Sequence, residues 1–332
     1  MEEHLKKLLR RLGLFGRARQ MAERGHVARR LLQSVPPYPQ HRGEAIEPFF
    51  IVGSGRCGTT LLRRLLMAGN EVHVPPESWT LHKLIFRFRK YRWIMEWEDL
   101  VRWTVNSFAY QGKGAGGTVK QWFDGSSLYP LVSELTDFPD AKRSLAQLID
   151  GIYRYHGRIH EASFTRWGDK YPYNVYFMPP ILEVFPKAKF IHMLRDGTDV
   201  VSSWLNMEGY DDLKGRALRW KSAVTMFRQF MKEHPCRCLE VRYEDLVRNP
   251  TGTIEKVCNF LSLNFFAEMA RSAAPKQEMG QVAQLAQHEN VFKSVSAKYI
   301  GKGHRTLNDK QKARIADLIG DELGACGYPL PR

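Results

Sequence analysis

The sequence predicts an α/β protein with one main domain, in which helices flank a central parallel β-sheet. Short apolar runs at 48–52 and 187–194 fit strands that are buried on both faces. Each run ends in glycine or turn residues, and a segment of helical spacing follows it. Strands that alternate with helices in this way lie parallel and are joined by right-handed crossovers.

Later segments continue the alternation. We expect a further strand at 71–74 and another at 238–243. Thr198 or Asp199 is predicted to cap the helix that follows the 187–194 strand. Late helices are expected at 251–263 and 308–323.

Composition and charge narrow the classes of function. The chain has 332 residues, of which 43% are hydrophobic and 26% charged, and these values are typical of a globular protein with a sizeable core. It carries 50 Lys and Arg against 35 Asp and Glu, a formal charge of +15. A positive field concentrates anionic ligands, so nucleic acid, an anionic membrane surface or a polyanionic nucleotide all fit.

The five cysteines indicate a reducing compartment, and we expect a cytoplasmic protein. Their number is odd and no CxxC pair is present, so the sequence predicts neither a disulfide framework nor a metal site. The N-terminus lacks the apolar run of a secretory signal, and no window approaches about 20 apolar residues.

Residues 1–45 are expected to form a basic extension in front of the main domain at 46–332. Within it, 1–33 read as an amphipathic helix or helix pair that docks on an anionic membrane or on the body of the protein. The prolines at 36, 37 and 39 predict an extended linker.

A glycine-rich loop between the 48–52 strand and the 59–67 helix predicts an anion site. Glycines let the backbone approach a ligand closely, and a helix N-terminus presents free N–H groups with a positive partial charge. We expect the anion to contact Gly55, Arg56, Cys57, Gly58, Thr59, Thr60 and Leu61.

The sequence of this loop partly matches two general phosphate-binding motifs. It matches GxGxxG, with Glu71 near the acidic position of a dinucleotide site, although a lone GxGxxG is weak evidence. It also approaches GxxxxGK[ST], but Thr59 occupies the lysine position, which disfavours a magnesium-dependent nucleotide kinase. Arg56 supplies a cation from the loop instead.

A second anion site is predicted at the end of the 187–194 strand. Arg195 emerges there, and a helix that starts near Thr198 turns Ser203 back toward the same strand end. An arginine and a hydroxyl in this arrangement grip one phosphate by ion pairing and hydrogen bonding.

Together these segments resemble the family of sulfotransferases that use 3′-phosphoadenosine-5′-phosphosulfate (PAPS). The loop resembles the family's 5′-phosphosulfate loop, with Cys57 at a position that is usually Ser, and Arg195 with Ser203 resembles its 3′-phosphate site. The segment 167–172 looks like the family's GDK-x-P segment. In 241–250, Tyr243 matches the tyrosine that contacts adenine.

The resemblance runs from about Pro48 to about Leu307 and leaves the first 45 residues uncovered. It includes the basic glycine-containing loop 296–305, where Lys302 and Arg305 are the expected 3′-phosphate contacts, although this loop departs from the family's usual pattern. The resemblance implies a P-loop-like fold.

The resemblance implies in-line transfer of a sulfuryl group from PAPS to an acceptor hydroxyl, with adenosine 3′,5′-bisphosphate as the product and no metal. Glu77 is the expected general base, and His73 and His82 are nearby alternatives. Lys170 matches the family lysine that stabilises the leaving group, and Arg56 is a second cation for that charge.

With Glu77 as the base, the chain most resembles the family's carbohydrate and tyrosylprotein branch. The acceptor is expected to be a small molecule, a glycan or a glycolipid, with a carbohydrate or glycoconjugate hydroxyl favoured and a glycopeptide or protein tyrosine also open. The aromatic-rich stretch 79–130 is predicted to be a helical insertion that shapes the acceptor pocket. The rival functions are a kinase of the same fold, a dinucleotide oxidoreductase, and a basic adaptor that binds nucleic acid or membrane. Nucleic acid is not an expected partner of the enzyme, whereas peripheral membrane contact through 1–33 is.

Overall fold

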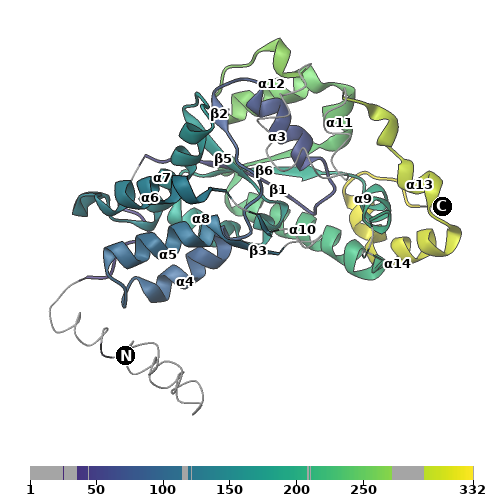
Figure 1. Cartoon of the computed structure of the whole chain (residues 1–332). Coiled ribbons are helices and arrows are strands. Elements are labelled where there is room, and N and C mark those ends of the chain that lie inside the picture. The colour runs from purple at the N-terminus through teal and green to yellow at the C-terminus, as the bar shows by residue number, and fades with distance from the viewer. Residues whose placement is uncertain are drawn as a thin grey trace. The chain divides into compact units, whose positions relative to one another are not determined.

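A computed structural model describes residues 25, 36–43, 45–113, 119–120, 122–207, 209, 211–270 and 295–331 (Figure 1). The helix or helix pair predicted over 1–33 lies outside these residues, apart from Gly25. The chain divides into two compact units. The first comprises Met1–Glu44 and Lys83–Ile152, and the second comprises Ala45–His82 and Tyr153–Arg332.

The second unit is built on a five-stranded sheet whose order is β2-β5-β1-β6-β7. The strands are β1 (Phe49–Gly53), β2 (Val72–His73), β5 (Arg166–Lys170), β6 (Lys189–Leu194) and β7 (Cys238–Arg242). Every neighbouring pair is parallel, which confirms the predicted fold class. All five residues of β1 are buried, as expected for the apolar run that forms it.

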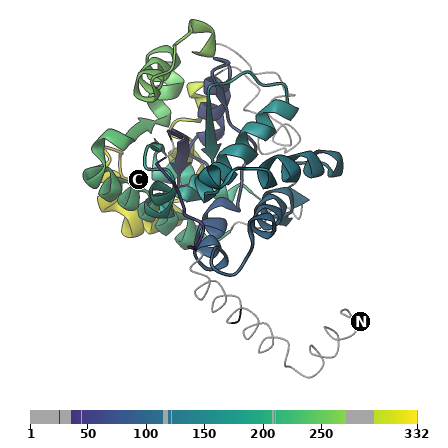
Figure 2. The ribbon, with the colours of Figure 1, turned by 90° about the vertical axis from the view of Figure 1, so that its left-hand side faces the viewer.

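Helices cover both faces of this sheet (Figures 1 and 2). On one face lie α3 (Thr59–Met67), α11 (Tyr243–Arg248) and α12 (Pro250–Leu261). On the other lie α9 (Gly197–Leu205), α10 (Leu213–Glu233) and α14 (Asp309–Ala325). Apolar side chains from both sets, such as Leu62, Trp220 and Ile319, form one continuous core with the strands. The short helices α8 (Met178–Val184) and α13 (Lys302–Thr306) complete this unit.

Strand β5 was not predicted, although its residues were recognised as a motif. A glycine and three charged residues in a five-residue segment are weak strand formers. Gly168 pairs with Phe49 of β1, and a Cβ on Gly168 would lie 2.4 Å from the Phe49 ring. The strand therefore forms because it fits between β2 and β1 rather than through its own propensity.

The predicted helix at 197–205 is present, but the prediction of its cap was wrong. Neither Thr198 nor Asp199 caps α9; the N-cap is Asp196, whose side chain accepts a hydrogen bond of 2.8 Å from the Thr198 backbone N–H. The helices predicted at 251–263 and 308–323 are α12 and α14, with ends within two residues of the prediction.

The first unit is mainly helical. It contains most of α4 (Leu81–Tyr91) and of α7 (Leu145–Ile159), together with α5 (Trp97–Ala109), α6 (Gly125–Thr136) and the hairpin of β3 (Gln111–Lys113) and β4 (Val119–Lys120). Many aromatic residues of the 79–130 stretch form its core: Phe88 and Phe108 are buried, and the Trp97 indole donates a hydrogen bond to the Leu135 carbonyl. Its role toward an acceptor stays a prediction.

Among the described residues, none of the helices combines the length and the apolar character needed to cross a bilayer.

Two histidines are buried beside the sheet in neutral form. His73 Nε2 lies 2.9 Å from His156 Nδ1, and both rings are almost inaccessible. Burial, followed by the charges of Arg63 and His160, lowers the pKa of His73 to about 3. Burial likewise lowers the pKa of His156 well below its ordinary value, with further contributions from His73, His160 and Arg63.

These histidines predict acid sensitivity of the fold. Their pKa values are lower in the folded state than the ordinary value of about 6.5, so unfolding takes up protons below pH 6.5. Their contribution to stability is present above pH 6.5 and is lost as the pH falls below it; for His73 the loss is about 1.4 kcal/mol per pH unit down to its folded-state pKa of about 3. Urea unfolding of the wild type and His156→Phe between pH 8 and pH 5 measures this loss. The variant is expected to show a shallower decline, and the exposed control His41→Gln the wild-type decline; equal slopes for His156→Phe and the wild type would contradict the assignment.

Candidate active site

The glycine-rich loop runs from the carboxyl end of β1 to the first residue of α3. Gly55 and Gly58 have φ values of 80° and 97°, a region that glycine adopts readily. A Cβ on Gly55 would lie 2.8 Å from the Trp204 ring, and one on Gly58 would lie 2.7 Å from the Tyr243 ring. The two glycines therefore let the loop pack directly against aromatic side chains of α9 and α11.

The side chain of Cys57 points into the protein. Its thiol belongs to the hydrophobic core, and burial raises its pKa. The loop therefore offers an anion its backbone N–H groups and the Arg56 side chain rather than the thiol. Because this side chain points into the core, having cysteine here instead of the usual serine removes no hydroxyl from the side of the loop that faces a ligand.

The second predicted anion site lies against this loop. Arg195 Nη1 donates a hydrogen bond of 3.2 Å to the Arg56 carbonyl, and Arg56 Nε donates one of 3.1 Å to Ser203 Oγ. Both contacts join the loop to residues more than 130 positions further along the chain. The guanidinium of Arg195 thus faces the glycine loop, at the carboxyl edge of β1 and β6.

Tyr243 lies between these two sites. The Arg195 guanidinium sits over its ring, 4.5 Å from the ring centroid, and Gly58 packs against the ring edge. Burial raises the pKa of the Tyr243 phenol. Its predicted contact with adenine stays a prediction.

Glu77 and Lys170 form an ion pair beside the loop. Glu77 follows β2 and is one-quarter exposed, whereas Lys170 ends β5 and is 1% exposed. Lys170 Nζ also donates a hydrogen bond of 3.3 Å to Thr60 Oγ1, in the first turn of α3. The structure therefore brings the predicted base, the predicted leaving-group cation and the loop together.

The alternative bases are placed less favourably. His73 is buried against His156, and with a pKa of about 3 it is a weak base. The ring of His82 stacks on Phe177, with 4.2 Å between the ring centroids.

Cations are concentrated around the loop. Burial, followed by the charge of Arg195, lowers the pKa of the Arg56 guanidinium. Arg63 of α3 is fully buried and donates a 2.7 Å hydrogen bond through Nε to the Val74 carbonyl, close to Glu77 in the chain. Burial lowers its pKa to about 10, while the charge of Glu77 opposes this shift. The protein therefore keeps several cations out of water at this edge of the sheet.

Asp169, beside Lys170 in β5, is buried and has a structural role. It accepts hydrogen bonds of 2.6 Å from the Tyr153 hydroxyl and 2.7 Å from the Asn174 amide. Burial raises its pKa to about 7. Because side chains alternate along a strand, Asp169 points away from the face that carries Lys170 and holds β5 in place.

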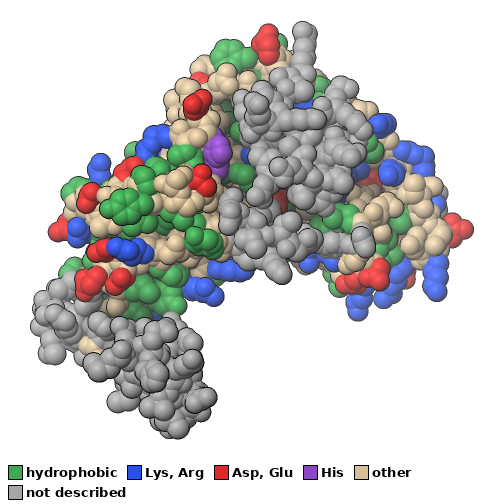
Figure 3. All heavy atoms as spheres, viewed as in Figure 1, with side chains coloured by type: hydrophobic (Ala, Val, Ile, Leu, Met, Phe, Trp, Pro, Cys, Tyr) green, Lys and Arg blue, Asp and Glu red, His purple; other side chains and the backbone are tan. Residues whose placement is uncertain are grey.

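The two expected basic contacts near the C-terminus differ in their surroundings. The Arg305 guanidinium donates to the carbonyls of Ile300 and Lys298 in its own segment. Lys302 is exposed at the start of α13. Figure 3 shows Lys and Arg side chains gathered on the side of this face where Figure 1 places α13 and α14. The roles of both residues toward a phosphate stay predictions.

A groove of about 410 Å³ lies next to the loop. Its lining includes Tyr173, Tyr176 and Arg219, and the Arg219 guanidinium sits 4.8 Å from the centroid of the Tyr173 ring. The Tyr173 hydroxyl would be 3.7 Å from a Cβ on Gly55. An aromatic and cationic surface therefore borders the loop.

Three carboxylates that organise the site were missed from the sequence. Asp196 caps α9, Asp199 accepts from the backbone N–H groups of Gly301 and Gly303, and Glu244 accepts from the Asp196 backbone N–H at 3.0 Å. The i, i+4 spacing of Arg195 and Asp199 was the available signal.

Glu71 does not serve as the ribose ligand of a dinucleotide site. Both of its carboxylate oxygens accept hydrogen bonds from Asn264, one from the backbone N–H and one from the side-chain amide, each at 2.7 Å. Glu71 is therefore not available as the acidic residue that a dinucleotide site requires.

Comparison with known proteins identifies the family. Residues 48–268 match the model of the sulfotransferase family, which is more than half of the chain. A putative protein-tyrosine sulfotransferase of Caenorhabditis briggsae is 25% identical over 226 residues, 66% of this chain and 67% of the relative. The omega-hydroxy-beta-dihydromenaquinone-9 sulfotransferase Stf3 of Mycobacterium bovis is 24% identical over 263 residues, 66% of this chain and 63% of the relative.

Solved structures agree on the fold. The sulfotransferase domain of the Synechococcus PCC 7002 olefin synthase superposes with a TM-score of 0.59 at 17% identity, covering 89% of this chain and all of that domain. The sulfotransferase domain from the curacin biosynthetic pathway gives 0.57 at 18% identity, covering 87% of this chain and all of that domain. The chain belongs to the sulfotransferase family, and the prediction of a sulfotransferase with a P-loop-like fold is confirmed.

The close packing of Gly55 predicts that the loop tolerates no side chain there. Gly55→Ala places a Cβ 2.8 Å from Trp204 at a φ that alanine rarely adopts, so we expect a loss of about 1–3 kcal/mol in the free energy of unfolding. Gly125→Ala is the control, because a Cβ there meets nothing within 4 Å. Thermal unfolding of both variants measures the difference, and equal midpoints would refute the packing argument.

Proposed function

We propose that this sulfotransferase transfers the sulfuryl group of PAPS to an acceptor hydroxyl and releases adenosine 3′,5′-bisphosphate. The observation that carries the proposal is the contact of the glycine loop with Arg195 and Ser203. Two anion sites that meet at one sheet edge suit a nucleotide with phosphate groups at both its 5′ and 3′ positions. A nucleoside triphosphate has no 3′-phosphate and leaves the second site without a purpose.

Three residues near the loop have a role in this reaction: Glu77, Lys170 and Arg56. Glu77 takes the proton of the acceptor hydroxyl as its oxygen attacks sulfur, and the bond between sulfur and the bridging oxygen of the 5′-phosphate breaks. The electron pair of that bond leaves with the nucleotide, where Lys170 and Arg56 stabilise the negative charge that develops. The ion pair of Glu77 with Lys170 supports these roles because it holds both groups at the loop in charged form.

Different segments bind different parts of the nucleotide, and Lys302 and Arg305 of the basic loop 296–305 add to the 3′-phosphate site. The loop residues 55–61 bind the 5′-phosphosulfate, Tyr243 contacts adenine, and Arg195 with Ser203 binds the 3′-phosphate. We place these groups in the main domain, 46–332, and assign contact with the membrane surface to residues 1–33 of the basic extension 1–45.

The acceptor is a hydroxyl compound that enters beside Glu77. The relatives named above act on protein tyrosine or on a hydroxylated menaquinone, while the sequence favours a carbohydrate or glycoconjugate. The groove lined by Tyr173, Tyr176 and Arg219 suits a planar or sugar-like group, because aromatic faces and a guanidinium offer both stacking and hydrogen bonds. An acceptor screen with labelled PAPS therefore compares a tyrosine peptide, an oligosaccharide and a prenol alcohol.

Ligand-induced stabilisation tests the donor. Adenosine 3′,5′-bisphosphate is expected to raise the unfolding temperature more than adenosine 5′-phosphate, because only the first occupies both anion sites. ATP with Mg²⁺ tests the kinase alternative. Stabilisation by ATP with Mg²⁺ and none by the bisphosphate would overturn the proposed function.

Arg195→Ala is expected to weaken binding of adenosine 3′,5′-bisphosphate about 30-fold or more, because a buried charged partner of the 3′-phosphate is removed. Binding of adenosine 5′-phosphate is expected to change less than about threefold. Isothermal titration measures both, with the exposed Arg248→Ala as the control for a general loss of positive charge. Equal losses for the two nucleotides in Arg195→Ala would remove Arg195 from the 3′ site.

Glu77→Gln is expected to lower kcat by about 10²–10⁴, the usual effect of losing a general base, with affinity for adenosine 3′,5′-bisphosphate nearly unchanged. Turnover with the best acceptor from the screen, together with isothermal titration, separates the two effects. Glu233→Gln, on the exposed end of α10, is the matched control. Turnover near the wild-type level in Glu77→Gln would exclude Glu77 as the base.

A further inference from the structure

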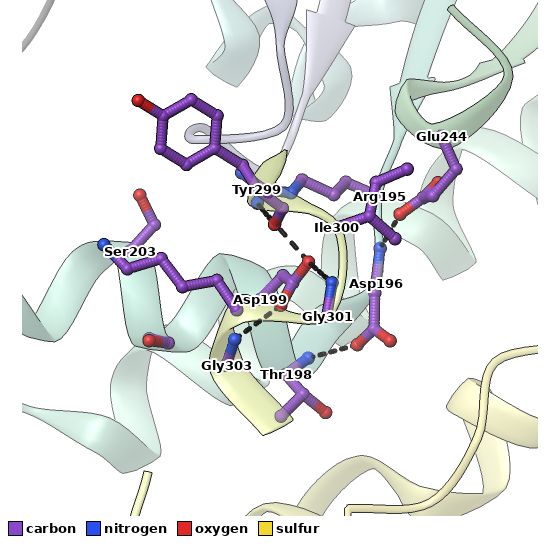
Figure 4. A network of polar contacts seen from close by, with 12 residues as sticks. Arg195, Asp196, Thr198, Asp199, Ser203, Glu244, Tyr299, Ile300, Gly301 and Gly303 are labelled. Atoms are coloured by element: carbon purple, nitrogen blue, oxygen red, sulfur yellow. Dashed lines mark hydrogen bonds and ion pairs between the residues drawn. The ribbon is translucent and has the colours of Figure 1, made fainter. Parts of the chain in front are cut away.

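The segment that carries Lys302 is attached to α9 at several points, and two of the hydrogen bonds go to one buried carboxylate. Asp199 Oδ1 accepts a 2.6 Å hydrogen bond from the Gly303 backbone N–H, and Oδ2 accepts one of 2.9 Å from the Gly301 backbone N–H (Figure 4). The Asp199 side chain has no exposed surface. A buried carboxylate is stable only where its oxygens are paired, and these two N–H groups pair both of them.

The same carboxylate fixes Arg195. Asp199 Oδ2 lies 3.4 Å from Arg195 Nη2, and Nη2 also donates a 2.9 Å hydrogen bond to the Tyr299 carbonyl. Nη1 is occupied by the Arg56 carbonyl. Within the part of the chain that the structure describes, Arg195 Nε is a buried donor with no hydrogen-bond partner. The guanidinium is thus held through its two terminal nitrogens, while its third nitrogen, Nε, makes no hydrogen bond to the described residues.

Close backbone packing fixes where the turn at 301–303 lies against α9. A Cβ on Gly303 would lie 2.5 Å from the Thr198 carbonyl oxygen, so the turn touches the backbone of α9 directly. Gly301 has a φ of 68°, in the left-handed region that glycine favours. Lys302 stands between these two glycines, so the position of its backbone is set by the same contacts.

We propose that Asp199 is the positioning residue of the 3′-phosphate site. It does not contact the nucleotide; it orients Arg195 so that Nε stays available to the 3′-phosphate, and it holds the 299–303 turn so that Lys302 stands at the same site. The two backbone N–H groups and the guanidinium neutralise the carboxylate, which otherwise repels a phosphate. This inference rests on the proposed function, because it assigns the residue that organises its 3′ site.

Asp199→Asn tests the inference, because the amide keeps the shape but presents an NH₂ group to one of its donor partners. Affinity for adenosine 3′,5′-bisphosphate is expected to fall about tenfold or more, while affinity for adenosine 5′-phosphate stays within about twofold. Asp317→Asn, on the exposed side of α14, is the control and is expected to change neither value. A structural role alone weakens both nucleotides together, so equal losses in Asp199→Asn would overturn the inference, as would unchanged binding of the bisphosphate.

A double-mutant cycle measures whether Asp199 acts through Arg195. The combined loss of Arg195→Ala and Asp199→Asn is expected to be smaller than the sum of the two single losses, because Asp199 acts in part by orienting Arg195. Additive losses would contradict the positioning role.

Gly303→Ala provides a second route that leaves Asp199 and Arg195 intact and serves if Asp199→Asn does not fold. It forces the turn away from Thr198 and is expected to give the same selective loss of the bisphosphate. Full bisphosphate affinity in Gly303→Ala would show that the turn is not needed.

Failure of this inference is distinguishable from failure of the proposed function. If the wild type does not prefer the bisphosphate over adenosine 5′-phosphate, the proposed 3′ site itself fails. If the wild type prefers the bisphosphate and Arg195→Ala removes that preference but Asp199→Asn retains it, only the role of Asp199 fails.

Discussion

The guanidinium of Arg195 holds four separate parts of the second unit at one point. It donates to the carbonyl of Arg56 in the glycine loop and to the carbonyl of Tyr299, faces Asp199 in α9 and sits over the ring of Tyr243 in α11. A buried cation is stable only where its donors are paired and its charge is balanced. The position of this one side chain therefore constrains the loop, α9, α11 and the 299–303 turn together.

Three cations and the carboxylates that pair with them meet at the same edge of the sheet. Arg56, Lys170 and Arg195 converge there, and Glu77 and Asp199 are the carboxylates that contact them. Burial and the neighbouring charge of Arg195 lower the pKa of Arg56, because a like charge nearby disfavours the charged form. In the proposed function, a polyanionic nucleotide would offset this repulsion between the cations.

Local patterns predicted the parts of the fold that local forces create. The apolar run of β1, the glycine loop and the spacing of α3 appear in the structure at the expected residues. Strand β5 was not predicted because Gly168 and its charged neighbours form a strand only when Phe49 packs over the glycine. The cap of α9 was misplaced by two or three residues because Asp196, Thr198 and Asp199 all suit an N-cap by type. The backbone direction that chooses among them is set by the sheet.

The sequence by itself determined the fold class and the glycine loop and predicted the residue types of two anion sites, because strand, turn and helix preferences act over a few neighbouring residues. Tertiary structure decided which side chains meet. Arg195 and Ser203 reach the loop only because β6 pairs beside β1, and Lys170 meets Glu77 only because β5 pairs between β1 and β2. It also directed Asp199 to a turn more than 100 residues away, by contacts that no local pattern encodes. Hydrogen bonds over such separations form only after the chain has packed, since they depend on strand order and helix placement rather than on spacing.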